Sequence, residues 1–343
     1  MILTVYFSFE ATSKKDRGTN MIKTYIYSEK ENKIIKNIDI TKEKQYLTNT
    51  TDLIWVDLFD TSLEELKTVG EIFDFHPLAM EDCLQYTLRS KVDQYPNHSF
   101  FIFHATIYNE EKEEEFIIHP LNIFLGKNYV VTVHQERINA IGKAVNKVLS
   151  DSHIMKKGSD YLLYSLLDEI VDEYFPILSR LSERIDELED EMYIHPAQEI
   201  SEEFLALKRT IVLFRRVIRP KKQIFTSISN RRLLTVREEH IPYFMDLVDH
   251  LERISDSLEV YRDLVSGAMD TYFSLVSART NNTMKSLTII TVMTAIIAAI
   301  TGFFGMNVPL PYQDSPLMTV VIFIVLASIP ILVWLVSTYK NRR

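Results

Sequence analysis

Two uncharged apolar stretches in the last fifth of this chain constrain its fold more than any other feature. They run from residue 287 to 304 and from residue 317 to 336, and neither contains Asp, Glu, Lys or Arg. A helix of roughly 20 apolar residues crosses a hydrocarbon core of about 30 Å. We therefore expect two transmembrane helices, joined by an external loop over residues 305–316 and followed by a basic tail over residues 337–343.

The charges beside these stretches predict their orientation. Basic residues lie before the first stretch and after the second: Arg279, Lys285, Lys340, Arg342 and Arg343. The connecting loop has no basic residue and one acid, Asp314. Because Lys and Arg next to a span stay on the cytoplasmic side, we expect a multi-pass protein of the cell membrane with both termini in the cytoplasm.

The rest of the chain has the composition of a water-exposed protein. Residues 1–7 lack the basic region and the cleavage site of a signal peptide, so we expect this part to be cytoplasmic. The single cysteine, Cys83, excludes an intramolecular disulfide and is typical of a reducing compartment. A net charge of −9 opposes nucleic-acid binding and is compatible with the attraction of cations.

The first 160 residues have the pattern of a mixed α/β domain. Segments rich in aromatic and β-branched residues predict strands at 22–27, 53–58, 99–108, 116–125 and 129–134. Thr61 and Glu64 have the spacing of a capping box, and Pro77 after His76 suits the first turn of a helix. We expect a cytoplasmic α/β domain over residues 1–160.

Beyond Tyr161 the apolar residues repeat at intervals of three and four. One such stripe consists of Leu178, Leu181, Ile185, Leu188 and Met192, and a second consists of Phe204, Leu207, Ile211, Phe214 and Ile218. His195-Pro196 separates them, which predicts a hairpin of amphipathic helices within residues 161–240. The acidic outer faces of this hairpin are interpreted as solvated surfaces, with cation accumulation as the alternative.

A third stripe begins at Phe244 and continues without a break to Gly302. It predicts one helix over residues 241–304, about 90 Å long at 1.5 Å per residue. This helix would leave the cytoplasmic domain as a stalk and become the first span. A heptad pattern of such length favours helix–helix assembly.

The first span has one face of small and hydroxylated residues. Two helices alone cannot enclose a hydrophilic path, whereas several copies of one helix around an axis can, so we expect a homo-oligomer. The residues of this face recur at three and four: Met284, Leu287, Thr291, Ala295, Ala298 and Gly302. Two interpretations remain open, because such residues permit close helix packing and also suit the lining of an axial pore.

The tripeptide Gly305-Met306-Asn307 ends the first span. Mg²⁺ dehydrates reluctantly and keeps several waters. A ring of Asn307 carboxamide oxygens would bind those waters weakly enough for release, as conduction requires. Gly305 would let backbone carbonyls approach the axis, and Met306 would support the turn.

From about Trp55 onward the chain resembles the CorA family of magnesium channels. The resemblance is carried by residues 76–82, 161–168 and 265–267 with Asp270, by Met284-Lys285, and by Gly305-Met306-Asn307. It implies an α+β membrane protein: a homopentameric funnel of cytoplasmic α/β domains around a long helical stalk, with two C-terminal transmembrane helices in each subunit. It also implies influx of Mg²⁺ and Co²⁺ driven by the membrane potential, with Gly305, Met306 and Asn307 in the selectivity filter and Asn281 added to the pore lining.

The family also senses intracellular Mg²⁺ between neighbouring subunits. The matching acids are Asp82 and Asp246, with Glu81 and Asp168 nearby. A regulatory Mg²⁺ bridging two subunits would hold the channel closed, and its loss would open the pore. Without the resemblance, Glu81 and Asp82 would be interpreted as first-turn acids of a helix that starts at Pro77.

Some positions depart from the family pattern. Ala295, Ile296 and Ala298 stand where many members have methionine, threonine and proline, so the hydrophobic constriction is expected at Met284 and Leu287. The outer loop lacks the common Met-Pro-Glu-Leu run, which leaves Asp314 to attract external cations.

Two other functions remain open. One is a Zn²⁺ transporter of the same superfamily, coupled to protons. The other is a membrane-anchored coiled-coil sensor or scaffold that does not conduct. An enzyme is not expected, because no nucleophile motif is present, and His76, Asp82 and Cys83 lack any recognised zinc spacing.

Overall fold

The computed structural model describes residues 22–40, 42, 51–85, 87, 89–108, 116–194, 197–230, 236–306, 315–318, 320–322, 324–326 and 328. The chain forms two compact units that divide between Met269 and Asp270. The first unit contains a β-sheet and the helices packed on it. The second contains the apolar C-terminal region.

The first unit is built on a seven-stranded sheet of order β2-β1-β3-β7-β6-β5-β4. The strands are β1 (Ile22–Ser28), β2 (Lys33–Lys36), β3 (Leu53–Phe59), β4 (Lys91–Gln94), β5 (Ser99–Tyr108), β6 (Phe116–Leu125) and β7 (Tyr129–His134). Neighbours pair antiparallel except β3 and β7, which run parallel. The five predicted strands are confirmed. The two that were not predicted, β2 and β4, are short edge strands whose lysines and polar residues hide the strand pattern.

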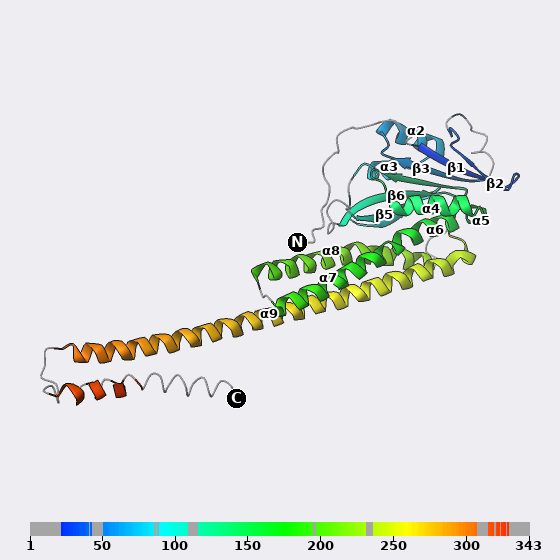
Figure 1. Ribbon diagram of the computed structural model, residues 1–343. Coiled ribbons are helices and arrows are strands. Elements are labelled where there is room, and N and C mark those ends of the chain that lie inside the picture. The colour runs from blue at the N-terminus through cyan, green and yellow to red at the C-terminus, as the bar shows by residue number, and fades with distance from the viewer. Residues whose placement is uncertain are drawn as a thin grey trace. The chain divides into compact units, whose positions relative to one another are not determined.

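One face of the sheet is covered by α2 (Leu63–Phe73) and α3 (Pro77–Asp82) (Figure 1). Leu66, Val69 and Phe73 of α2 belong to a buried cluster with apolar residues of β1, β3, β5, β6 and β7. The capping box predicted at Thr61 and Glu64 is wrong by one residue. The helix begins at Leu63, so Ser62 is the cap: its hydroxyl accepts from the Glu65 amide (3.2 Å), and the Glu65 carboxylate accepts from the Ser62 amide (2.9 Å).

The opposite face is covered by helices that follow β7 in the chain. The elements after β7 are α4 (Asn139–Ser150), α5 (His153–Lys156), α6 (Ser159–Asp172), α7 (Tyr174–Ile194), α8 (Gln198–Ser229), the short 3₁₀ helix η1 (Glu238–His240) and α9 (Ile241–Phe304). Phe103 of β5 stacks on Phe225 of α8, with ring centroids 5.5 Å apart. The sheet therefore lies between two helical layers in the first unit (Figure 1).

The helical hairpin is confirmed as α7 and α8. Every residue of the two predicted stripes is buried. Arg184 of α7 forms an ion pair with Glu203 of α8, which joins the polar edges of the two helices. α7 ends at Ile194, and the predicted break at His195-Pro196 lies outside the described residues.

The predicted long helix is confirmed as α9, whose 64 residues correspond to about 96 Å of helix at 1.5 Å per residue. Within the first unit it packs against α6 and α8, where Phe244 lies 6.1 Å from Tyr164 and 6.5 Å from Phe225 between ring centroids. Its entry is fixed by the buried carboxylate of Asp160, which accepts a hydrogen bond from the Arg237 amide (2.9 Å).

The second unit contains the apolar end of α9. In the part of the chain that the structure describes, α9 is the one helix long and apolar enough to cross a membrane. A shorter apolar helix spans Pro316–Leu326. The rest of the predicted second span, most of the loop and the basic tail lie outside the described residues, so those predictions stay predictions.

Candidate functional site

The predicted pore face lies along the C-terminal part of α9. Met284 and Leu287 are each 62% exposed within the chain. The other predicted lining residues are exposed as well: Asn281, Thr291, Ala295, Ala298 and Gly302. An apolar helix with this much uncovered surface requires lipid or other protein chains around it.

The hydroxyl groups of this segment are satisfied inside the helix. Those of Thr288, Thr291 and Thr294 donate to the carbonyls four residues earlier at 2.8–2.9 Å. Because no donor is left unpaired, these polar residues can enter an apolar medium at little cost. Their lone pairs remain available as acceptors, which suits a face that meets water or a hydrated cation.

α9 ends in a tight turn at Gly305. The Gly305 amide donates to the carbonyls of Thr301 (3.0 Å) and Gly302 (3.2 Å), and the Met306 amide donates to Phe303 (3.4 Å). A Cβ at position 305 would lie only 3.2 Å from the Thr301 carbonyl oxygen, so the turn favours glycine. Asn307 and Asp314 lie outside the described residues, and their predicted roles rest on the sequence.

The acids Glu81 and Asp82 lie at the end of α3, not at its start. The interpretation that the helix macrodipole favours them in a first turn is therefore wrong, because α3 is only six residues long and ends at Asp82. A helix C-terminus favours cations instead. Accordingly, Asp82 accepts a hydrogen bond from Lys91 Nζ (2.7 Å), and Glu81 accepts one from Gln85 Nε2 (2.9 Å).

Asp168 and Asp246 lie in a different part of the first unit, on α6 and α9. No hydrogen bond or ion pair joins either of them to Glu81 or Asp82 among the residues described. Both instead contribute to the electrostatic environment of Tyr164, whose pKa is raised mainly by burial and further by these two carboxylates. The four predicted regulatory acids thus form two separate pairs within one chain.

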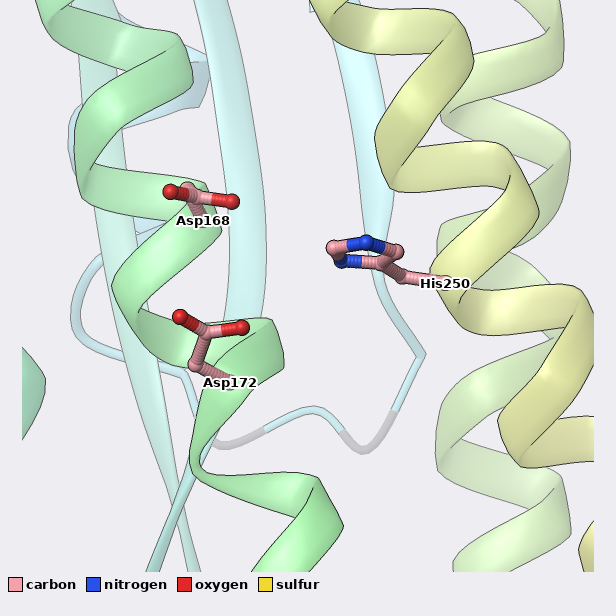
Figure 2. Close-up of side chains that lie close together, drawn as sticks. All are labelled: Asp168, Asp172 and His250. Atoms are coloured by element: carbon pink, nitrogen blue, oxygen red, sulfur yellow. The ribbon is translucent and has the colours of Figure 1, made fainter.

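Asp168 belongs to a compact group of three potential metal ligands. Asp168, Asp172 and His250 each offer one ligand atom within 4.8 Å of the other two. Figure 2 shows the two carboxylates one helical turn apart on α6, with the imidazole of α9 pointing toward them. Asp246 lies one turn before His250 on α9, with its Oδ2 3.6 Å from His250 Nε2.

The surroundings of this group disfavour the simultaneous ionisation of Asp168 and Asp172. Burial raises the pKa of Asp168, and the negative charge of Asp172 raises it further. Lys147 offsets this only in part, because its Nζ lies 3.6 Å from Asp168 but 2.9 Å from Glu169.

Asp172 and His250 are not among the site residues predicted from the sequence. A signal was available in the spacing, because Asp168 and Asp172, and likewise Asp246 and His250, are four residues apart and so share one helix face. What the sequence does not show is that these two faces meet.

The chain matches a family model described as CorA-like Mg²⁺ transporter protein over residues 50–340. It is 34% identical over 287 residues to the cobalt/magnesium transport protein CorA of Thermotoga maritima, covering 82% of this chain and 80% of that protein. It is 32% identical over 279 residues to the putative metal ion transporter YfjQ of Bacillus subtilis, covering 81% of this chain and 84% of that protein.

Solved structures give the same fold. The complete CorA magnesium transporter of Methanocaldococcus jannaschii superposes with a TM-score of 0.79 at 24% identity, covering 92% of this chain and 97% of that one. The ZntB cytoplasmic domain of Vibrio parahaemolyticus superposes with a TM-score of 0.59 at 12% identity, covering 76% of this chain and 100% of that one. At these identities the likeness concerns the fold alone, whereas the extent of the family match and the identity to the Thermotoga maritima protein show that the chain belongs to the CorA-like Mg²⁺ transporter family.

Proposed function

We propose that this chain is a subunit of a channel, not an enzyme, that carries Mg²⁺ and also Co²⁺ into the cytoplasm. The observation that carries the proposal is the long helix α9, which leaves a water-exposed domain, presents an uncovered apolar segment and ends at Gly305-Met306-Asn307. Relatives named as magnesium and cobalt/magnesium transporters support the choice of ions.

The membrane potential is a sufficient driving force for the influx of Mg²⁺. An inside-negative potential of 100 mV favours the entry of a divalent ion by about 4.6 kcal/mol, twice the value for a single charge. The proposal places residues 1–160 and 161–240 in the cytoplasm, with spans over residues 287–304 and 317–336 of the cell membrane. Both termini then lie inside.

The pore requires several copies of α9 around one axis, and we infer a homopentameric funnel. The exposed face from Asn281 to Gly302 would line it. Met284 and Leu287 would form the narrow apolar part, because they are the largest side chains of that face. Asn307 oxygens would hold the hydrated ion at the outer entrance, and Asp314 would raise the local cation concentration there.

Regulation would act through Mg²⁺ bound between subunits. Asp82 and Asp246 are the acids proposed to bridge neighbouring chains, with Glu81 and Asp168 beside them. Their oxygen ligands suit Mg²⁺, which prefers carboxylates and retained waters. Asp246 is available for this role, since its side chain is 55% exposed. Asp82 already pairs within its own chain with the ammonium of Lys91, which would compete with the ion.

A Zn²⁺ transporter coupled to protons is the second candidate. The shared fold with the ZntB domain and the imidazole of His250 favour it. Against it, the first span contains no ionisable residue that could relay protons. Influx that depends on a pH gradient would distinguish it from the channel.

The deciding experiment is an influx assay in liposomes loaded with a Mg²⁺-sensitive dye, under an inside-negative potential. We expect rapid influx that Asn307→Ala abolishes and that Asn146→Ala, a change at an exposed position of α4, leaves unchanged. Equal influx through the parent and Asn307→Ala would contradict the assignment of Asn307 to the selectivity filter. The absence of influx for every cation tested would favour a sensor or scaffold. Zn²⁺ influx that needs a pH gradient would favour the proton-coupled Zn²⁺ transporter.

A further inference from the structure

We propose that the pocket between α8 and the segment leading into β4 binds a nucleoside di- or triphosphate, with Arg89, Arg216 and Arg219 holding its phosphate groups. The proposal goes beyond cation transport, because it assigns an anionic ligand to the first unit. It does not rest on the proposed function, since binding to this pocket can be measured without transport.

The pocket has the size of a small-molecule site. Its volume of about 540 Å³ lies within the range of about 300–1,000 Å³ that such sites occupy. Its walls come from the end of α3, the loop before β4, β4 itself and α8. Val92, Pro220 and Ile224 supply apolar surface for a flat ring, and Thr87 and Gln223 supply polar groups that can fix its orientation.

The five basic residues from Arg215 to Lys222 of α8 divide into three groups. Arg215 and Lys222 form ion pairs with glutamates of α9 at 3.4 and 2.7 Å, and Lys221 is buried. Arg216 and Arg219 are exposed, and neither side chain forms a hydrogen bond or an ion pair within the part of the chain that the structure describes. These two guanidinium groups therefore remain available to an anionic ligand.

Helical spacing places both of them beside the pocket. Arg216 precedes the lining residue Pro220 by four positions, and Arg219 precedes the lining residue Gln223 by four. Because residues four apart share one face of a helix, both arginines belong to the face of α8 that lines the pocket. Arg89 lies on the opposite wall, and its guanidinium likewise has no partner among the residues described.

Three guanidinium groups around one pocket favour a ligand with several negative charges. Each presents a planar fork of donors that matches the oxygens of a phosphate group. At the other end of the pocket, Lys91 already pairs with the carboxylates of Asp82 and Asp93 at 2.7 and 2.6 Å. The phosphate groups are therefore assigned to the side of the arginines, and the nucleoside to the apolar wall.

The loop that carries Arg89 is held from behind by His104. Burial lowers the pKa of His104 to about 4, so its ring is neutral. We assign the ring proton to Nε2, because the Thr87 carbonyl 2.6 Å away can only accept, and Nδ1 then accepts from the Ser90 hydroxyl at 3.0 Å. A loop fixed at both ends before binding loses less conformational entropy when a ligand arrives.

The test is calorimetric titration of the full chain in detergent with ATP, in a chelator that keeps Mg²⁺ off the nucleotide. We expect one ATP per chain, with adenosine and inorganic triphosphate each binding at least tenfold more weakly. Arg89→Gln and Arg219→Gln should each weaken ATP binding by about tenfold or more, because each removes a hydrogen bond between charged groups. Arg209→Gln, an exposed arginine of α8 about 15 Å along the helix from Arg219, is the matched control and should bind as the parent does.

A second pair of variants tests the pocket without changing its charge. Gln223→Trp fills the pocket from an exposed position and should weaken ATP binding at least tenfold. Thr226→Trp adds the same side chain at an exposed position of α8 outside the lining and should leave the affinity unchanged. Thermal unfolding of each variant without ATP checks that its fold is intact.

Absence of ATP binding to the parent, or parent-like affinity in Arg219→Gln or Gln223→Trp, would overturn the proposal. Inorganic triphosphate that binds as tightly as ATP would show that the apolar wall takes no part, and the nucleotide would then be the wrong ligand. A failed influx assay leaves the ATP titration untouched, and absent ATP binding leaves the channel untouched.

Discussion

The ammonium group of Lys221 on α8 donates a hydrogen bond to the backbone carbonyl of His104 on β5 at 2.7 Å. Lys221 is only 1% exposed, and no acid pairs with it among the described residues. The Tyr174 hydroxyl donates to the same carbonyl at 2.6 Å and accepts from the lysine. Burial lowers the pKa of Lys221 well below its ordinary value.

The first prediction concerns this buried lysine. In Lys221→Met the His104 carbonyl keeps its bond from Tyr174, so we expect the free energy of unfolding to change by less than about 1 kcal/mol. In Tyr174→Phe the same carbonyl keeps the lysine, but the amine loses one of its two acceptors, the Tyr174 hydroxyl, and we expect a loss of about 1–3 kcal/mol. Denaturant unfolding of both variants measures the two values.

The pH dependence of the same pair of proteins gives a second readout. Because the folded pKa of Lys221 is lowered, the unfolded chain binds more protons between that pKa and the ordinary 10.5. The stability of the parent relative to Lys221→Met should therefore rise as the pH rises through this window. A difference that is flat with pH would mean that Lys221 keeps the same charge in both states.

The second prediction concerns His134 and Asp57 in the sheet. Burial opposes the protonation of His134, but the Asp57 carboxylate at 3.0 Å and the Glu136 carbonyl at 2.7 Å outweigh it and raise the pKa of His134. A raised pKa stabilises the fold fully below pH 6.5, and this contribution is lost as the pH rises through the folded value. Asp57→Asn should therefore cost about 1–3 kcal/mol at pH 6 and less at pH 8.

Unfolding of the parent and Asp57→Asn at the two pH values measures this difference. Asp52→Asn serves as a control, because Asp52 is a buried acid that accepts a hydrogen bond from the Glu29 amide. An Asp57→Asn cost that grows with pH would contradict the assignment of a charged His134.

The third prediction concerns the end of α9. In Gly305→Ala the added Cβ would lie 3.2 Å from the Thr301 carbonyl oxygen, which opens the turn before Asn307. We expect Mg²⁺ influx in liposomes to fall at least tenfold with little change in the unfolding of the first unit. Gly267→Ala is the matched control, because its Cβ meets nothing within 4 Å and alanine is the better helix former. Normal influx in Gly305→Ala would show that the turn tolerates a side chain.

Much of this architecture could be predicted because its elements carry strong periodic patterns. The stripe from Leu178 to Met192 and the long repeat after Phe244 give α7 and α9, since each must bury one continuous apolar face. The edge strands β2 and β4 could not be predicted because each has only four residues, with exposed lysines in β2 and mostly polar residues in β4, so neither shows a period of two. The capping box was misplaced because Thr61 and Ser62 both have a glutamate three residues later, and only the first helical residue decides between them.

Some residues of the candidate site could also be grouped from the sequence, whereas others are brought together only by the fold. The lining residues of α9 follow from spacing along one helix, so the sequence was enough to group them. The cluster of Asp168, Asp172 and His250 depends on which faces of α6 and α9 meet, and that contact joins residues about 80 positions apart in the chain. Likewise, the pairing of Asp82 with Lys91 depends on where the chain turns back after α3.

The last prediction uses that pairing to test the proposed regulation. Lys91 Nζ lies 2.7 Å from Asp82 and 2.6 Å from Asp93, so it competes with any cation for the Asp82 carboxylate. A partly exposed ion pair of this kind is worth about 0.2–1 kcal/mol. Lys91→Met should therefore lower the internal Mg²⁺ concentration that halves influx by roughly 1.4- to 5-fold, as the free-energy range implies. Asp82→Asn should raise that concentration, and Lys67→Met, which removes an exposed lysine of α2, should leave it unchanged. A Lys91→Met channel that closes only at higher internal Mg²⁺ would mean that the ammonium supports the closed state, and Asp82 would then not be the ion's ligand.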